Sequence, residues 1–429
     1  MKKFLFPLLA IALIVSCAKP MQEEPIVDPI EGQEPEQKAS PTEIAWARNI
    51  LLQPQSTKIL EQSNSFAFNF FKAVSKKQNQ NLFLSPYSVS AVLGMLYNGA
   101  NGKTKDEIAK ILGMSDYTPE EVNQYYRELT KALLEVDPSS SLSFANAVWV
   151  NKGISIKGSF AEINKTYYDA EANTLDFTQS SAIQTVNDWC KEKTKGTIPK
   201  ILESIDPSTL AILANAIYFK SFWTHDFDKS KTVEKPFHNI NGTTSRISMM
   251  HQKQMDLNYV QMDRCGMLIC PYANTAFAMN LILPVEGEDL DTLIEDLDAS
   301  TWQVMMTHYS SAKVTFSMPR FKIESDLQEL KDILAAMGMP SAFSDDADFS
   351  AMFEGVQTYI SQVIQKSYIS VDEDGTEASA VTLAHMQGSV IDPLPTPPTV
   401  EMILDRPFIF AITEKSTGAI LFMGKVTSL

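Results

Sequence analysis

The chain has 429 residues, and its 44% hydrophobic and 21% charged residues are typical of a globular protein. Its net charge of −16 would repel a phosphate backbone, so we expect no nucleic-acid partner and interpret the charge as a source of solubility. This length can bury a large core and by itself allows two or three domains.

The first residues have the pattern of a signal peptide, predicted over residues 1–16. Lys2 and Lys3 precede an apolar run over residues 4–15, which is too short to span a membrane permanently. The run is followed by Ser16 and Cys17, and the sequence IVSC resembles the cleavage box of a bacterial lipoprotein. Cleavage before Cys17 would expose its thiol for a lipid anchor, on the cell surface or in the periplasm. The alternative is a plain secretory signal in which Cys17 is incidental.

Residues 17–42 are rich in proline and acidic side chains, and they cannot bury enough apolar surface to fold. We expect a disordered tether there. No later linker and no internal repeat divides the rest, which predicts a single domain over residues 43–429. Cys190, Cys265 and Cys270 are odd in number and lack metal-binding spacing, so we expect free thiols and no metal site.

Hydrophobic periodicity predicts helices in the first half of the domain and mostly strands in the second, which indicates an α+β fold. A strand over 209–220 is apolar on both faces, as expected in the middle of a sheet. The expected helices cover roughly 63–77, 87–99, 104–113, 119–135, 159–170, 181–194 and 326–337, and the expected strands 141–150, 209–220, several within 243–284, 359–371 and several within 400–426.

Signatures of enzymes are missing from the sequence. None of the five histidines has a His or Cys at a metal-binding offset, and no GxSxG motif occurs. Residues 98–108 contain Gly102-Lys103-Thr104, but Tyr97 stands where a phosphate loop needs its first glycine. We interpret this stretch as a turn between helices, with Thr104 capping the second helix. We therefore expect neither an enzyme nor a cofactor.

Residues 373–398 combine a small-residue stretch with a proline-rich end. Alternate residues from Thr376 to Ala384 are all Thr or Ala, so one face of a strand made from this stretch could lie against a packed core. The opposite face begins with Glu377, which should stay in water. The stretch is either a loop that can become a strand or an ordinary long surface loop.

A series of motifs runs along the chain from Asn81 to Val426: NLFLSPYSVSAVLGMLYNGANGKTKDEI, FANAVWV, VNDWCKEKTKGTIPKIL, LANAIYFKSFW, ISMMHQ, LILP, MPRFKIES, SYISVDEDGTEASA, DRPFIFAI and LFMGKV. In these motifs and in their order the sequence resembles the serpin family of protease inhibitors, over about residues 42–429. The resemblance implies one monomeric domain with about nine helices, a large central mixed β-sheet, two smaller sheets and an exposed reactive-centre loop over about 375–398.

The resemblance also implies which residues act when the loop enters the sheet. Many serpins have a histidine ten residues before the hinge glycine, where this chain has Gln365; its amide can still donate and accept hydrogen bonds. The matched hinge residues are Glu373, Gly375, Thr376, Glu377, Ala378, Ser379 and Ala380, and the matched strand-opening residues are Ser85, Ser88, Asn215, Trp223 and Gln365.

In the mechanism that the resemblance implies, a protease cleaves the loop and is held as an acyl-enzyme while the freed hinge inserts into the central sheet. The hinge has no bulky, charged or proline residue on its entering face, which favours inhibition. The alternative is a non-inhibitory serpin that acts as a binding or chaperone-like surface protein.

Counting fourteen residues from Gly375 places the scissile bond between Ser389 and Val390, whereas counting back from the DRPF motif points near Thr396. We favour the first count, with a window that also includes Met386, Gln387, Gly388 and Ile391. No Lys or Arg occurs between Lys366 and Arg406, so we expect elastase-, subtilisin- or chymotrypsin-like target proteases. Papain-like proteases remain an alternative. The target itself is not encoded in any motif.

Overall fold

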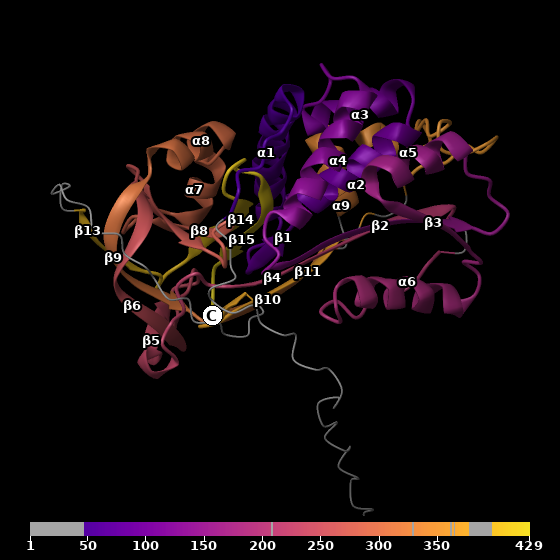
Figure 1. Ribbon diagram of the computed structural model, residues 1–429. Coiled ribbons are helices and arrows are strands. Elements are labelled where there is room, and N and C mark those ends of the chain that lie inside the picture. The colour runs from indigo at the N-terminus through magenta and orange to yellow at the C-terminus, as the bar shows by residue number, and fades with distance from the viewer. Residues whose placement is uncertain (1–46, 207–208, 328–329, 361–362, 364, 377–396) are drawn as a thin grey trace, which may run out of the picture. The chain divides into compact units, whose positions relative to one another are not determined.

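The computed structural model describes residues 47–206, 209–327, 330–360, 363, 365–376 and 397–429, and its helices and strands are labelled in Figure 1. In this part of the chain nine α-helices and two short 3₁₀ turns pack around two β-sheets. The helices are α1 (Pro54–Ser75), α2 (Pro86–Gly99), α3 (Gly102–Leu112), α4 (Pro119–Glu135), α5 (Gly158–Tyr168), α6 (Ser180–Lys193), α7 (Leu290–Asp296), α8 (Ala299–His308) and α9 (Leu330–Met337), and the 3₁₀ turns are Lys229–Lys231 and Pro340–Phe343.

The strands alternate between long sheet-spanning segments and short edge segments. They are β1 (Leu82–Leu84), β2 (Ser141–Asn151), β3 (Ala170–Leu175), β4 (Ala211–Phe222), β5 (Val233–His238), β6 (Thr244–Gln261), β7 (Cys265–Pro271), β8 (Phe277–Pro284), β9 (Ser310–Pro319), β10 (Phe321–Leu327), β11 (Gln365–Val371), β12 (Gly375–Thr376), β13 (Thr399–Ile403), β14 (Phe408–Glu414) and β15 (Ile420–Val426).

A six-stranded mixed sheet runs through the middle of the molecule in the order β10-β11-β12-β4-β2-β3. Only the β2–β3 pair is parallel. Helices α2, α3, α4, α5 and α9 lie on one side of this sheet and α6 lies on the other (Figure 1). Helices can pack on both faces of the sheet because successive side chains of β2 point to opposite faces. Val148 and Val150 join the main core, whereas Trp149 joins a second hydrophobic cluster with Trp189 of α6.

The second sheet has nine strands, in the order β1-β15-β14-β8-β7-β6-β9-β13, with β5 paired to β6. The two smaller sheets expected from the sequence are joined here because the 18-residue strand β6 serves both of them. Its first part pairs with β5 and β9, its last part pairs with β7, and the register shifts between Gln252 and Met255. The bulge lets one strand follow two differently directed sheets.

Several expectations for local structure were wrong, among them the strand expected over 359–371, which begins only at Gln365. Helix α1 begins at Pro54 rather than near residue 63, since proline is well suited to the first helical turn. The expected helix over 326–337 is strand β10 up to Leu327 and helix only from Leu330. Thr104 does not cap α3: the cap position is Asn101, and the buried Thr104 hydroxyl accepts a hydrogen bond from the Asp348 backbone N–H at 2.9 Å.

Candidate functional site: the loop hinge and the gap in the central sheet

The short strand β12 places the start of the predicted reactive-centre loop inside the central sheet. Thr376 is paired with Val371 of β11 on one side and with Ser221 of β4 on the other. A tight turn makes this possible, because the Asp372 N–H donates to the Gly375 carbonyl at 3.0 Å. Gly375 has a φ of 149°, a conformation that favours glycine. The sequence of the turn therefore directs the chain back between β11 and β4.

Beyond β12, the facing edges of β4 and β11 are unpaired within the described residues. Strand β4 pairs with β2 along residues 211–220 and β11 pairs with β10 along 365–371, but no described strand pairs with their other edges below Thr376. At the level of β12 the two edges are separated by the width of one strand, because β12 pairs with both. The arrangement provides backbone donors and acceptors for one additional strand.

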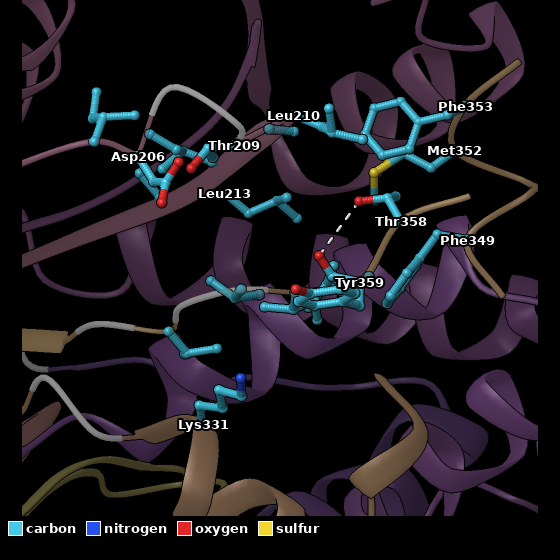
Figure 2. A pocket seen from close by; sticks show the side chains of 18 of the residues that line it. Asp206, Thr209, Leu210, Leu213, Lys331, Phe349, Met352, Phe353, Thr358 and Tyr359 are labelled. Carbon is cyan, nitrogen blue, oxygen red and sulfur yellow. Dashed lines mark hydrogen bonds between the residues drawn. The ribbon is translucent and has the colours of Figure 1, made fainter. Parts of the chain in front are cut away.

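Cavities follow this gap along its length. A small void of about 20 Å³ lies below Thr376, between residues 217–219 of β4 and 367–369 of β11. A cavity of about 880 Å³ follows the first half of β4 and is shown in Figure 2, where Leu213, Phe349 and Tyr359 lie around it. Its walls also come from α2, α6, α9 and the segments that precede β4 and β11. Unfilled space therefore lies beside β4 at residues 217–219, near the hinge, and again at residues 211–214, at the opposite end of the strand.

Thr376 faces the core, as the alternation of the loop predicted. Its side chain is buried, and its hydroxyl lies 2.6 Å from the Tyr272 hydroxyl. Burial raises the pKa of Tyr272, so this phenol stays neutral and available as a hydrogen-bond partner. Tyr272 stacks on Trp223 with ring centroids 4.5 Å apart. Thr376, the first residue of the entering face, is thus already packed against a fully buried part of the core.

Trp223 holds the backbone of the hinge. Its indole Nε1–H donates to the Asp372 carbonyl at 2.9 Å, and its backbone N–H donates to the Asp374 carbonyl at 3.0 Å. Phe227 adds a third bond of this kind, from its N–H to the Glu373 carbonyl at 3.1 Å. Residues 223–227, which follow β4, therefore hold three consecutive backbone carbonyls in place, those of residues 372–374. These bonds do not depend on the side chains of the three residues.

Glu373 is fixed through its carboxylate. Arg320 Nε donates to the two carboxylate oxygens at 2.9 and 2.7 Å, Arg320 Nη2 donates to Oε1 at 2.5 Å, and Thr232 donates through its hydroxyl. Burial alone would raise the pKa of Glu373, but the hydrogen bonds from Arg320 and Thr232 hold it below its ordinary value. No sequence pattern indicates Arg320 as its partner, because the two residues are 53 positions apart.

The two carboxylates next to Glu373, those of Asp372 and Asp374, have different partners. Asp374 forms an ion pair with Lys229 at 2.7 Å. Asp372 has no cationic partner among the described residues, and burial, together with the neighbouring Asp374 and Glu373 charges, raises the pKa of Asp372. Its carboxylate instead accepts the N–H of Asp374 at 3.0 Å within the turn.

Ser85 and Gln365 meet at the end of the gap away from the hinge. The Gln365 side chain accepts the Ser85 N–H at 3.2 Å and donates to the Ser85 carbonyl at 2.9 Å. The Ser85 hydroxyl caps α2 by accepting the Ser88 N–H at 3.2 Å. Ser88 is also buried, and its hydroxyl has no hydrogen-bond partner among the described residues. The polar contact expected of Gln365 is therefore present.

Asn215 does not join this cluster. Its side chain donates to Asn146 of β2 at 2.8 Å, and Asn146 donates in turn to the Tyr168 carbonyl at 2.7 Å. Two serines that the sequence did not single out tie the sheet to β1 instead. Ser325 accepts the Phe83 N–H at 2.9 Å, and Ser367 donates to the Phe83 carbonyl at 2.5 Å. No local sequence pattern distinguishes a serine that makes such a contact between strands from any other serine.

Several predicted positions lie outside the described residues: Cys17, the hinge residues after Thr376 (Glu377, Ala378, Ser379, Ala380) and the predicted scissile window from Met386 to Ile391. Within the described part, Cys190, Cys265 and Cys270 are free and buried, and burial raises the pKa of Cys190 to about 12 and that of Cys265 to about 11. No group of three potential metal ligands occurs there, and no described helix has the length and apolarity to cross a membrane.

Comparison with known proteins identifies the family. The model of the serpin (serine protease inhibitor) family matches residues 61–429. The chain is a serpin. It is 34% identical over 384 residues to an uncharacterized serpin-like protein of Thermococcus kodakarensis, covering 88% of this chain and 87% of the relative. It is 32% identical over 375 residues to the leukocyte elastase inhibitor of Xenopus laevis, covering 85% and 97%.

Solved structures confirm the serpin fold. The native state of tengpin, a thermophilic serpin, superposes with a TM-score of 0.79 at 30% identity, over 90% of this chain and 100% of tengpin. Thyroxine-binding globulin in complex with thyroxine gives a TM-score of 0.77 at 29% identity, over 86% and 99%. Similar serpins thus include an elastase inhibitor and a hormone-binding protein by name, so the family does not by itself assign an activity.

Proposed function

We propose that this serpin is a suicide-substrate inhibitor of serine endopeptidases. The observation that carries the proposal is the position of β12: Gly375 and Thr376 already lie between β4 and β11, and the edges below them are unpaired within the described residues. A cleaved loop has a prepared place to enter. Thr376 also meets the core with a small, uncharged side chain, as insertion requires.

The proposed reaction begins as ordinary proteolysis. The protease serine attacks the carbonyl carbon of Ser389, the peptide bond to Val390 breaks, and the protease remains attached to Ser389 as an ester. The freed segment then adds to the sheet as a strand. About fifteen residues at about 3.3 Å each carry the ester about 50 Å from its starting point. Each new backbone hydrogen bond contributes about 1 kcal/mol net, so a dozen outweigh a large distortion of the protease.

We further propose elastase-, subtilisin- or chymotrypsin-like proteases as targets, because no basic residue lies between Lys366 and Arg406. Papain-like cysteine proteases are a second class that the same loop would admit. A lipid on Cys17 would hold the inhibitor as a monomer at a bacterial cell surface or on the periplasmic side of a membrane. Its role there would be protection against proteases met at that surface.

The test is incubation of the purified protein with a panel of these proteases. We expect a 1:1 complex that survives SDS, and release of a C-terminal peptide whose first residue, read by N-terminal sequencing, is Val390. If every protease only cleaves the loop and stays active, the serpin is non-inhibitory and the alternative of a binding or chaperone-like protein holds. For the anchor, full-length protein made in a bacterial host should partition into detergent and take up labelled fatty acid, and Cys17→Ser should do neither.

A further inference from the structure

The cavity of Figure 2 passes from one face of the central sheet to the other, because side chains from both faces of β4 line it. Ala211 and Leu213 pack against the main core. Ile212 and Ala214 belong instead to the second hydrophobic cluster, which contains Trp189 of α6. A neighbouring strand would separate these two sides, so the cavity occupies the position of a strand.

The walls of this cavity are largely apolar and incompletely covered. Residues 211–213 are only partly buried, although β4 is apolar on both faces there. On the wall that precedes β11, Val356 and Ile360 are also partly buried, and Tyr359 is 46% exposed. The volume of about 880 Å³ lies within the range of about 300–1,000 Å³ that is typical of small-molecule sites. The cavity is therefore large enough, and apolar enough, to bury a small molecule.

The backbone edge of β4 adds polar groups to this apolar space. Within the described residues, β4 pairs with β2 along 211–220, and no strand pairs with its other edge at 211–214. A free edge presents a row of N–H and C=O groups, and covering them with a purely apolar molecule would leave them without hydrogen bonds. A suitable ligand therefore carries a donor and an acceptor close together, as a carboxamide does.

The charged side chains at the walls disfavour an anionic ligand. They are Asp206, Lys331, Asp332 and Asp345. The three aspartates are exposed, which places them at the mouth of the cavity. Lys331 already has its amine 5.9 Å from the centre of the Tyr359 ring (Figure 2). An acid would thus meet three charges of its own sign and one cation that already has a partner.

The register of the hinge shows which loop residues need the same space. Gly375 pairs with Phe222 and Thr376 with Ser221, so the two residue numbers of each antiparallel pair add up to 597. Continued without a break, this register brings residues 383–386 of the loop opposite residues 211–214 of β4. A molecule in the cavity would therefore occupy the place of the last residues that enter before the predicted scissile bond.

We propose that this cavity binds a neutral, mainly apolar small molecule with a carboxamide group, and that the bound molecule prevents complete insertion of the loop. The binding site stands on the cavity alone, whereas its regulatory effect rests on the proposed inhibitory function. With the cavity filled, a protease would still cleave the loop, but the new strand could not reach its full length. Water would then hydrolyse the ester, which leaves a carboxylate on Ser389 and frees the protease serine.

Binding is measured by calorimetry with three probes that share a ten-carbon chain: decanamide, decanoate and decylamine. We expect decanamide to bind 1:1 and about tenfold more tightly than either charged probe, because only its head group both donates and accepts hydrogen bonds. Ala211→Phe and Val356→Phe each place a ring in the cavity and should abolish binding. Ala336→Phe, on the exposed surface of α9 and outside the cavity, is the matched control and should bind as wild type.

The regulatory effect is measured with a protease that forms SDS-stable complexes with the wild-type protein. Saturating decanamide should lower the yield of complex, while cleavage of the loop continues at a similar rate. The Ala336→Phe control should respond in the same way. Protein whose loop was cleaved beforehand should no longer bind decanamide, because its inserted loop fills the cavity.

Each part of the inference has its own contrary result. No binding to the uncleaved protein, or unchanged binding by both Ala211→Phe and Val356→Phe, would overturn the site. Equal affinity for decanoate or decylamine would overturn the ligand class, and an unchanged yield of complex would overturn the regulatory effect. If the cleaved wild-type protein binds decanamide as tightly as the uncleaved protein while Ala211→Phe does not bind it, the loop has not entered the sheet. The failure then lies in the proposed inhibitory function and not in the ligand site.

Discussion

The side-chain amide of Gln365 makes two hydrogen bonds to the backbone of Ser85, accepting its N–H at 3.2 Å and donating to its carbonyl at 2.9 Å. One residue thus connects the first position of β11 to the start of α2, and both side chains are buried. If β11 moves away from β4 to admit a strand, Gln365 either moves together with Ser85 or loses these two hydrogen bonds. The strength of the two bonds therefore affects how readily the sheet accepts a new strand.

Replacing Gln365 with leucine should remove both bonds at nearly constant volume. The N–H of Ser85 would stay buried without this partner, whereas its carbonyl would keep the Val89 N–H at 3.3 Å, so the expected cost is about 2 kcal/mol in the free energy of unfolding. Urea unfolding measures this loss, and Gln303→Leu on the exposed surface of α8 is the control, with little expected change. Equal unfolding midpoints for Gln365→Leu and wild type would show that water or a rearrangement replaces the amide.

Sequence reasoning succeeded where the signal was local. Strand alternation alone puts Thr376 on the small face, and Thr376 is buried against Tyr272; the other residues of that face, 378–384, lie outside the described residues, so their burial stays a prediction. It missed Arg320 as the partner of Glu373, because an ion pair between residues 53 positions apart leaves no periodicity. Asn215 was assigned to the opening region by family likeness, whereas its hydrogen bond to Asn146 depends on the register of β2 and β4.

The carboxylate of Glu373 predicts a specific dependence on pH. Its pKa is lowered in the folded state, so the stability that it contributes is present above the ordinary glutamate pKa and is lost as the pH falls through the lower, folded value. Glu373→Gln should cost about 1–2 kcal/mol at neutral pH, discounted because Arg320 is 45% exposed. The difference from wild type in thermal unfolding should shrink on acidification.

Asp372 makes the comparison with Glu373→Gln necessary. Its pKa is raised, so protonation of Asp372 favours the folded state and partly masks the effect of Glu373 in the wild type alone. Asp372 is present in both proteins, so subtracting their stabilities at each pH removes the part of its contribution that comes from burial and from Asp374, and leaves only the part that depends on the Glu373 charge. A difference that stays constant from neutral pH to well below the ordinary glutamate pKa would contradict the assigned role of Glu373.

Thr376→Arg should convert the inhibitor into a substrate. Thr376 already lies between β4 and β11 against Tyr272, so a guanidinium there must either stay buried and unpaired, at a cost of several kcal/mol, or leave the sheet and block the place where the rest of the hinge would enter. Cleavage of the loop should continue at a similar rate while the yield of SDS-stable complex falls. Thr376→Ser, which keeps the hydroxyl and the small size, should inhibit almost as wild type. An unchanged yield for Thr376→Arg would mean that insertion of the loop does not require the hinge to be held in the sheet at Thr376.

The last prediction concerns specificity, and it depends on the lack of any Lys or Arg between Lys366 and Arg406. Trypsin-like proteases bind a basic residue against a carboxylate deep in their specificity pocket, and a neutral residue would leave that carboxylate unpaired. This penalty of a few kcal/mol lowers the association rate constant by a factor of about tens to thousands. Association rate constants measured in one buffer should therefore be far lower for trypsin than for elastase or subtilisin. Ser389→Arg should restore rapid inhibition of trypsin, and Ser389→Gln, long but neutral, should not. If trypsin is the fastest with the wild-type loop and cuts between Met386 and Ile391, the specificity argument is wrong, while the family assignment from the fold is unaffected.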